Sequence, residues 1–368
     1  MDQFYWHKRA RESVAQGYLS KEKTPTTLFH PTHARESSGC HIIDAYGKKY
    51  VDYVCGNGSN LIGYRDPHIN RAVIKKLEST GSLASIALVE EVLASEKLKE
   101  CFPFVDNFKF AGSSAEACAV AVEIAKRVTC RHQVVMQGHH GWLVRGHEYF
   151  GLPQITKDTA CFILEPVTQD IGKKNIEKLL KIRERCQQMG AILIFNEVNT
   201  GFRYKNLSVS NTHGILPDLI ILGKALSHGF SLAAVGGKQD IMCSEKYFAP
   251  STSCADIVSL EACREFIYQL TTKYDIHELW VEGQRFIDKF NVIANGVVKI
   301  VGYPTCGLIE GEFPMREQFL IECAKAGILF GNRWYFNFPL IKETEKTLGI
   351  VLDVCVKIKT SCRLRELN

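Results

Sequence analysis

The stretch Pro217-Asp218-Leu219-Ile220-Ile221-Leu222-Gly223-Lys224 decides the fold class of this chain. Its four consecutive apolar residues predict a short buried strand, and the lysine follows almost directly. An earlier apolar run, residues 191–195, ends at Asn196, which lies 28 positions before Lys224. A lysine after one buried strand can hold an aldehyde cofactor as a Schiff base, while a polar group after another strand interacts with the far side of the cofactor ring.

The length and composition are those of a globular protein with more than one domain. A chain of 368 residues is long enough for one large domain and a smaller one. A composition of 46% hydrophobic and 23% charged residues is ordinary for a soluble globular protein. No apolar run approaches the roughly 20 residues that span a bilayer. Residues 1–9 mix polar and aromatic side chains, unlike a signal peptide, so we expect a cytoplasmic protein without a membrane partner.

The cysteines and the net charge bear on two classes of site. None of the 14 cysteines forms a Cys-x-x-Cys pair, and most lie singly in apolar stretches, as Cys55, Cys161 and Cys355 do. We therefore expect reduced, buried thiols and no metal site. The formal charge of +5 is modest, and short basic clusters such as residues 181–185 fit the solvated face of a helix. Binding of nucleic acid is possible but not indicated.

Helical and strand patterns alternate through the middle of the chain, which is typical of a sheet covered by helices. The predicted helices cover residues 67–77, 88–98, 115–128 and 176–189, and Gly190 caps the last one. The predicted strands cover residues 108–111, 134–136, 161–164, 191–195 and 219–222. Residues 42–54 predict two strands around a Tyr-Gly turn. After residue 256 we expect helices, strand-like pieces at 298–301 and 307–309, a helix at 317–326 and a closing helix from residue 343 to about 359.

The stretch Ala111-Gly112-Ser113-Ser114-Ala115-Glu116-Ala117 is a candidate phosphate loop. It joins a predicted strand to a predicted helix, and the unpaired N–H groups at a helix N-terminus favour an anion. On its own, such a loop is also a common helix cap.

Taken in chain order, these stretches resemble the class III aminotransferases, enzymes that use pyridoxal 5'-phosphate (PLP), and especially their glutamate-1-semialdehyde 2,1-aminomutase branch. The resemblance extends from about Gly39 to Leu348. It implies the α/β architecture of fold type I PLP enzymes, with a mainly parallel sheet flanked by helices and a smaller α+β domain from both chain ends. We expect residues 1–55 in the small domain, 56–255 in the large PLP-binding domain and 256–368 in the C-terminal small domain.

The resemblance assigns roles to particular residues. Lys224 would be the catalytic residue that bonds PLP. Ser113, Ser114 and Ala115 match the first three positions of the family's Ser-Gly-Thr-Glu-Ala phosphate loop, with Ser114 in place of its glycine. His139 stands where an aromatic residue stacks on the PLP ring, or else caps a strand end. Val198 would cover the opposite ring face.

The resemblance also suggests roles for Glu165 and His140. Glu165 matches a Glu-Pro dipeptide and would either face the site or pair with an arginine such as Arg203. His140 would orient the loop that carries His139.

Asn196 is the main departure from the family, which has an aspartate there. Aspartate keeps the pyridine nitrogen protonated through a charge-assisted bond. Asn196 can donate to an unprotonated nitrogen or accept from a protonated one, and since it carries no charge we expect the nitrogen to be largely unprotonated. The alternative, in which Glu197 takes this role, requires a slip of the strand by one residue, which would flip every side chain to the other face.

The resemblance also suggests an assembly and a reaction. Thr252 matches a threonine that reaches the PLP phosphate of the partner subunit, so we expect a homodimer. We expect an aminotransferase or aminomutase-like enzyme that moves an amino group of a small amine or amino-acid substrate. The alternatives are another PLP reaction, such as α-decarboxylation of a bulky or macromolecule-linked amino acid, and a PLP-binding protein without turnover.

Overall fold

The computed structural model of the chain describes residues 5–15, 31, 33–148, 154–168, 172–243 and 254–366. Two compact units make up the chain. The larger unit comprises Pro67–His277, and the smaller unit combines Met1–Asp66 with Glu278–Asn368. The smaller unit is therefore formed from both chain ends.

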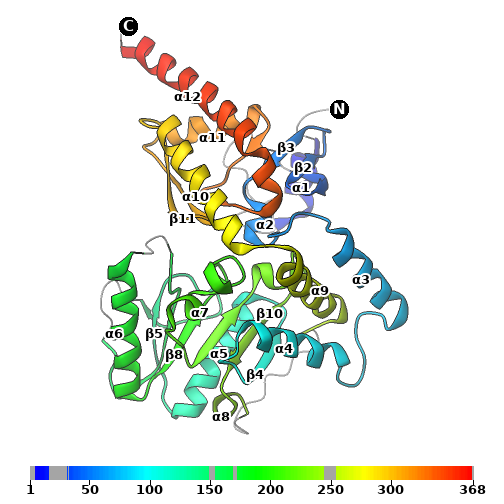
Figure 1. The fold of residues 1–368 in the computed structure, drawn as a ribbon, viewed down its shortest axis with the longest axis vertical. Coiled ribbons are helices and arrows are strands. Elements are labelled where there is room, and N and C mark those ends of the chain that lie inside the picture. Colours follow the sequence, from blue (N-terminus) through cyan, green and yellow to red (C-terminus); the bar gives the residue numbers. More distant parts are fainter. Residues whose placement is uncertain are drawn as a thin grey trace. The chain divides into compact units, whose positions relative to one another are not determined.

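A seven-stranded sheet forms the centre of the larger unit, in the order β4-β10-β9-β8-β7-β5-β6. The bounds are β4 Asn107–Ala111, β5 Gln133–Gln137, β6 His147–Glu148, β7 Thr159–Leu164, β8 Ile192–Asn196, β9 Leu219–Leu222 and β10 Ala233–Gly237. All pairs are parallel except those of β10, which runs antiparallel to both of its neighbours. The expected mainly parallel sheet is confirmed. Figure 1 shows its strands extending from β5, beside α6, to β4, beside α4.

The long helices of the larger unit arise where the sequence predicts them, whereas two short helices, at residues 209–213 and 239–242, were not predicted. Their bounds are α3 Pro67–Ser79, α4 Val89–Cys101, α5 Ser114–Thr129, α6 Lys173–Met189, α7 Val209–His213, α8 Gln239–Met242 and α9 Ile257–Lys273, with short 3-10 turns η3 Lys205–Leu207 and η4 Lys224–Ser227. Ser113 caps α5 by accepting from the Glu116 N–H, and Gly190 ends α6 in the left-handed conformation. The predicted strands and helices of this unit are confirmed, with ends within three residues of those expected.

The core of the larger unit lies between α5 and the sheet. Alanines and a valine of α5 (Ala117, Ala121, Val122) are buried against apolar side chains of β7, β8 and β9. Small residues on this helix face let the helix axis approach the strands closely, and the removal of this apolar surface from water stabilises the layer. This packing fixes where the N-terminus of α5 lies relative to the ends of the strands.

Two sheets support the smaller unit. One has the order β1-β2-β3-β13 and the other β11-β12-β14. The bounds are β1 Ala34–Ser38, β2 His41–Asp44, β3 Lys49–Asp52, β11 Lys299–Tyr303, β12 Cys306–Glu310, β13 Ile328–Leu329 and β14 Arg333–Tyr335. The helices are α1 Tyr5–Ser13, α2 Cys55–Gly58, α10 Ile276–Ile293, α11 Met315–Lys325, η5 Phe338–Glu343 and α12 Thr344–Glu366. The parallel pair of β3 and β13 joins the N-terminal and C-terminal parts of the chain.

Asp52, at the end of β3, is a buried carboxyl group in the smaller unit. It accepts hydrogen bonds from the N–H groups of Val54 and Cys55 and from the Tyr64 hydroxyl. Burial raises the pKa of Asp52 to about 6, although these donors favour its charged form.

The boundaries of the two units differ from those expected at residues 55/56 and 255/256. Helix α9 belongs to the larger unit because it packs along α3 and α4. The loop at residues 56–66 belongs to the smaller unit, where Asn60 accepts a hydrogen bond from the Asn337 amide. These packing partners are distant in sequence, so composition alone does not reveal them.

Among the described side chains, most cysteines are buried free thiols, as expected. One of them, Cys40, lies beside His41 and Glu343, and the three could offer ligand atoms to a metal. Burial raises the pKa of the Cys40 thiol to about 11, which disfavours the thiolate that binds metal.

Candidate functional site

The candidate site lies at the carboxyl ends of four adjacent strands of the larger unit. Lys224 follows β9, Asn196 ends β8, Glu165 follows β7 and His139 follows β5. Because parallel strands end at the same edge of a sheet, residues far apart in sequence meet there. The structure thus brings together the lysine, the asparagine and the His139 loop that the sequence singled out.

Lys224 adopts an unusual backbone conformation. Its φ is +47°, a left-handed value that costs free energy in a residue with a side chain. The preceding Gly223 has an extended backbone with φ of −172°, and the chain then turns into η4. The Lys224 Nζ donates to Asn199 Oδ1 at 2.5 Å. The sharp turn therefore directs the amine toward the residues that follow β8.

Gly223 marks a close approach between the lysine and the phosphate loop. A Cβ atom at this position would lie 2.3 Å from Ser114 Oγ and 3.4 Å from both methyl groups of Val198. Any larger residue at this position would require the Ser114 side chain to move. Ser114 and Val198, assigned to different parts of the cofactor by the resemblance, thus flank the residue before Lys224.

The N-terminus of α5 offers backbone donors at this edge of the sheet. Ser113 Oγ accepts from the Glu116 N–H at 3.3 Å, and a Glu116 carboxylate oxygen accepts from the Gly112 N–H at 3.0 Å. The N–H groups of Ser114 and Ala115 are in the first turn, where helical geometry gives them no carbonyl partner within the helix. They are the donors that could hold an anion.

Two glycines let the loop after β5 lie close against the rest of the site. A Cβ on Gly138 (φ +98°) would lie 2.8 Å from a Glu165 carboxylate oxygen. A Cβ on Gly141 (φ +76°) would lie 2.7 Å from the Cβ of Ala115. Both positions therefore need glycine for conformation and for space, and the loop lies directly on the start of α5.

Glu165 faces the site, which is the first of its two predicted roles. One carboxylate oxygen accepts from the His139 N–H at 3.0 Å, and the other accepts from the Asn199 amide at 2.8 Å. Asn199 thereby joins the carboxylate to Lys224, because its oxygen accepts from the lysine and its nitrogen donates to Glu165. The sequence reasoning missed Asn199. Its place three residues after Asn196, in the same loop, was the available signal.

Glu197, the residue after Asn196, is held by hydrogen bonds of its own. Glu197 is fully buried and accepts from Thr200 Oγ1, the Val209 N–H, and both the N–H and the hydroxyl of Ser210. Burial raises the pKa of Glu197, and these donors counter that effect. Its carboxylate therefore anchors the start of α7, which argues against the alternative in which Glu197 replaces Asn196.

The two histidines of the loop differ in exposure. His139 is exposed and His140 is buried. The His140 Nε2 lies 3.1 Å from the Gln137 carbonyl oxygen, and its Nδ1 lies 3.1 Å from Asn196 Nδ2. Burial lowers the pKa of His140 to about 4, so the ring is neutral at neutral pH. Thr252, the remaining residue of the predicted site, lies outside the described residues.

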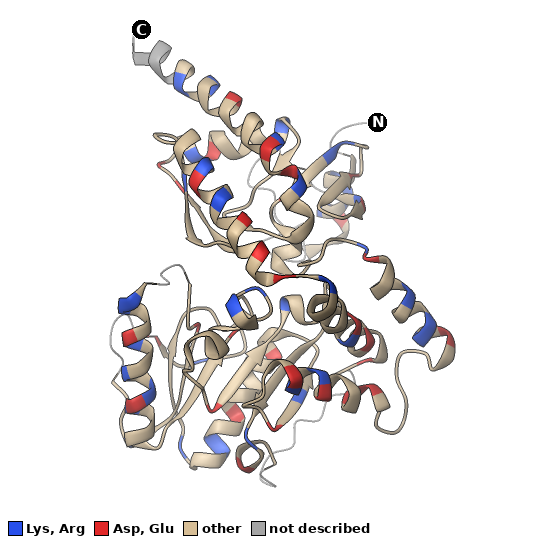
Figure 2. Cartoon of the chain, in the orientation of Figure 1, with Lys and Arg blue, Asp and Glu red and all other residues tan. Residues whose placement is uncertain are grey.

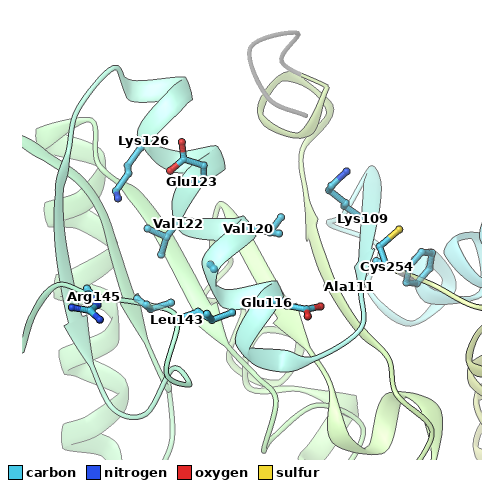
Figure 3. Close-up of a pocket in the computed structure, with 13 residues that line it drawn as sticks. Lys109, Ala111, Glu116, Val120, Val122, Glu123, Lys126, Leu143, Arg145 and Cys254 are labelled. Atoms are coloured by element: carbon cyan, nitrogen blue, oxygen red, sulfur yellow. The ribbon is translucent and has the colours of Figure 1, made fainter. Parts of the chain in front are cut away.

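A separate pocket of about 580 Å³ lies on the outer side of α5 (Figure 3). It shares Ala111 and Glu116 with the phosphate loop, and its lining combines apolar side chains such as Val120 and Leu143 with charged ones such as Lys126. It is distinct from the site around Lys224.

Two general features bear on possible partners. Figure 2 shows two acidic positions among the more numerous basic positions along α6. None of the helices within the described part of the chain combines the length and the hydropathy that a membrane span needs.

Comparisons with known proteins agree with this architecture. The model of the family described as aminotransferase class-III matches residues 22–151 and 142–332. A glutamate-1-semialdehyde 2,1-aminomutase of Bordetella avium is 31% identical over 292 residues, covering 66% of this chain and 66%, just under two thirds, of that protein. A 3-aminobutyryl-CoA aminotransferase of Cloacimonas acidaminovorans is 27% identical over 253 residues, covering 61% of each chain. Among solved structures, an omega-transaminase from Sphaerobacter thermophilus has the same fold, with a TM-score of 0.81 at 20% identity over 96% of this chain and 97% of that one.

Proposed function

Since this chain belongs to the class III aminotransferase family, we propose that it is a PLP-dependent aminotransferase or aminomutase-like enzyme acting on an amine or amino acid, with Lys224 as its catalytic residue. The observation that carries this proposal is the meeting of Lys224 with the N-terminus of α5. Gly223 separates the two by so little that a Cβ there would lie 2.3 Å from Ser114 Oγ. An aldehyde bonded to the lysine and a phosphate at the helix start can thus belong to one small molecule.

The residues present fit PLP in their chemistry. Lys224 supplies the amine that bonds the aldehyde, and the N–H groups of Ser114 and Ala115, with the Ser113 cap, supply donors for the phosphate. Val198 and His139 would lie against the two ring faces, and Asn196 would face the ring nitrogen. When bound, PLP supplies an electron sink for the charge that develops on the substrate carbon.

Within the chain, Lys224 would move the proton of the substrate. Its Nζ would act as the general acid and base. Asn199 Oδ1, at 2.5 Å from Nζ, would hold the amine in place while it is not bonded to the cofactor, and Glu165 fixes the orientation of Asn199 by accepting from its amide nitrogen.

The direct test is to locate the cofactor on the chain. Purified protein with added PLP should show a visible absorption band, and borohydride reduction followed by peptide mapping should find the pyridoxyl group on Lys224. Lys224→Ala protein is the control and should carry no adduct. An unmodified Lys224 in protein saturated with PLP would refute the proposal. Changes of the band on addition of amines and keto acids would then identify the substrate class.

We also propose that the active unit is a homodimer in which Thr252 donates to the phosphate of the partner subunit. The support is the resemblance of residues 251–253 to the family's turn. Thr252→Ala should weaken PLP binding by about 0.5–3 kcal/mol, the range for a lost hydrogen bond to a charged group. Sedimentation that shows a monomer with undiminished affinity for PLP would contradict both parts.

A further inference from the structure

The Asn196 side chain is buried and held at three points. Its Nδ2 donates to the His139 carbonyl oxygen at 3.0 Å and lies 3.1 Å from His140 Nδ1. Its Oδ1 accepts from the Val198 N–H at 3.2 Å. Only 5% of the residue is exposed, so water does not compete for these groups.

The backbone determines which amide atom is nitrogen and which is oxygen. Exchange of the two atoms would place Oδ1 against the His139 carbonyl and Nδ2 against the Val198 N–H, two pairs of like groups. Neither backbone group can change its role, so these two contacts favour one orientation of the Asn196 amide, while the use of its second amide proton depends on His140.

His140 completes this arrangement. Its Nε2 faces the Gln137 carbonyl, which can only accept, so the ring proton is on Nε2 and Nδ1 is a bare acceptor. Burial lowers the pKa of His140 to about 4, although the Glu165 carboxylate and the carbonyls of Gln137 and Ile163 favour the charged form, and the ring is neutral at neutral pH. The second Asn196 amide proton therefore goes to His140 Nδ1.

Asn196 keeps one hydrogen-bonding capacity for a ligand, on its amide oxygen. Both amide protons are used, whereas Oδ1 has accepted one hydrogen bond and can accept another. We propose that His140 is a positioning residue that makes Asn196 an acceptor toward the pyridine nitrogen of PLP, so that this nitrogen is protonated without an aspartate. The inference rests on the proposed function, and it reverses the expectation of an unprotonated ring, which rested on the absence of a charge on Asn196.

Nuclear magnetic resonance of the protein with nitrogen-15-labelled PLP tests the inference. At neutral pH the ring nitrogen should have a pyridinium shift. His140→Phe, which removes the acceptor for Asn196, should move the signal toward that of free pyridine. His140→Gln, whose amide oxygen can accept again, should restore it. The control His132→Phe removes an exposed histidine before β5 and should leave the signal unchanged.

The possible outcomes separate the two proposals. A free-pyridine signal in unmodified protein with PLP on Lys224 would overturn the inference and leave the proposed function standing. Absence of PLP from Lys224 would overturn the proposed function and the inference with it. Independently of PLP, histidine-labelled protein should show His140 with its proton on Nε2, and a proton on Nδ1 would refute the positioning role.

Discussion

Replacement of Asn196 by aspartate changes one atom, the amide nitrogen, to oxygen. The new oxygen would face the His139 carbonyl, 3.0 Å away, and His140 Nδ1, 3.1 Å away, both of which are acceptors. Two acceptors, one of them buried and the other partly buried, would lose their donor, and each such loss costs about 1–3 kcal/mol. Because the loop can relax, we expect Asn196→Asp to lower the free energy of unfolding by about 2–4 kcal/mol at pH 7.5. An aspartate, the residue usual in the family, should thus be unfavourable in this chain.

The effect should depend on pH through His140. In the unmodified protein the folded pKa of His140, about 4, lies below its ordinary value of 6.5. As the pH falls from 6.5 toward 4, the unfolded chain binds the proton first, so folding loses about 1.4 kcal/mol per pH unit from this group. In Asn196→Asp a proton on Nδ1 would pair with the carboxylate and raise the folded pKa of His140. Protonation would then favour the folded state, and the variant should approach the parent in stability at lower pH.

Thermal unfolding of the cofactor-free proteins at pH 7.5 and 5.5, followed by circular dichroism, measures this difference. In a unit of this size each kcal/mol corresponds to roughly 2–4 °C in Tm. The control Asn295→Asp makes the same exchange at an exposed position and should change stability by less than about 0.5 kcal/mol. A variant at Asn196 that is as stable as the parent at pH 7.5 would refute the reasoning about its hydrogen bonds.

Three further outcomes follow from the contacts described above. Gly141→Ala should destabilise the protein by about 2–4 kcal/mol and weaken phosphate binding, because the new methyl group is in a left-handed conformation and in close contact with Ala115. Chemical denaturation and phosphate titration measure the two effects. Gly81→Ala is the matched control, since Gly81 has a φ of +81° with open space around it, and it should show the conformational cost alone. Glu197→Gln should cost about 1–3 kcal/mol in the same assay, since its new amide group would face a donor, and an unchanged midpoint would contradict the anchoring role. Asp52 should titrate near pH 6 in carbon-13 spectra. Because its folded pKa is raised above the ordinary 3.8, its contribution to stability is complete below pH 3.8 and is lost as the pH rises through 6. A titration midpoint near 4 would show that its hydrogen-bond donors outweigh burial.

Some features of this molecule could not be predicted from local pattern. Strand β10, Ala233–Gly237, has a low intrinsic preference for a strand, and the sequence did not identify it. Its small residues are explained by its neighbours: a Cβ on Gly236 would lie 2.5 Å from Phe108, and one on Gly237 would lie 2.6 Å from Leu219. The strand exists because β4 and β9 supply hydrogen bonds on both sides.

The sequence by itself determined the elements with strong local periodicity and the order of the motifs. The apolar run before Lys224, the capped helix after Ser113 and the polar end of β8 at Asn196 are all encoded within a few residues. The tertiary structure alone decided what these groups contact. That Asn199 accepts from Lys224, and that the Asn196 amide is held by the His139 carbonyl and His140, depends on strands β5, β8 and β9 lying close together in one sheet. A hydrogen-bond direction is set by distance and by which partner can donate, and a linear sequence records neither.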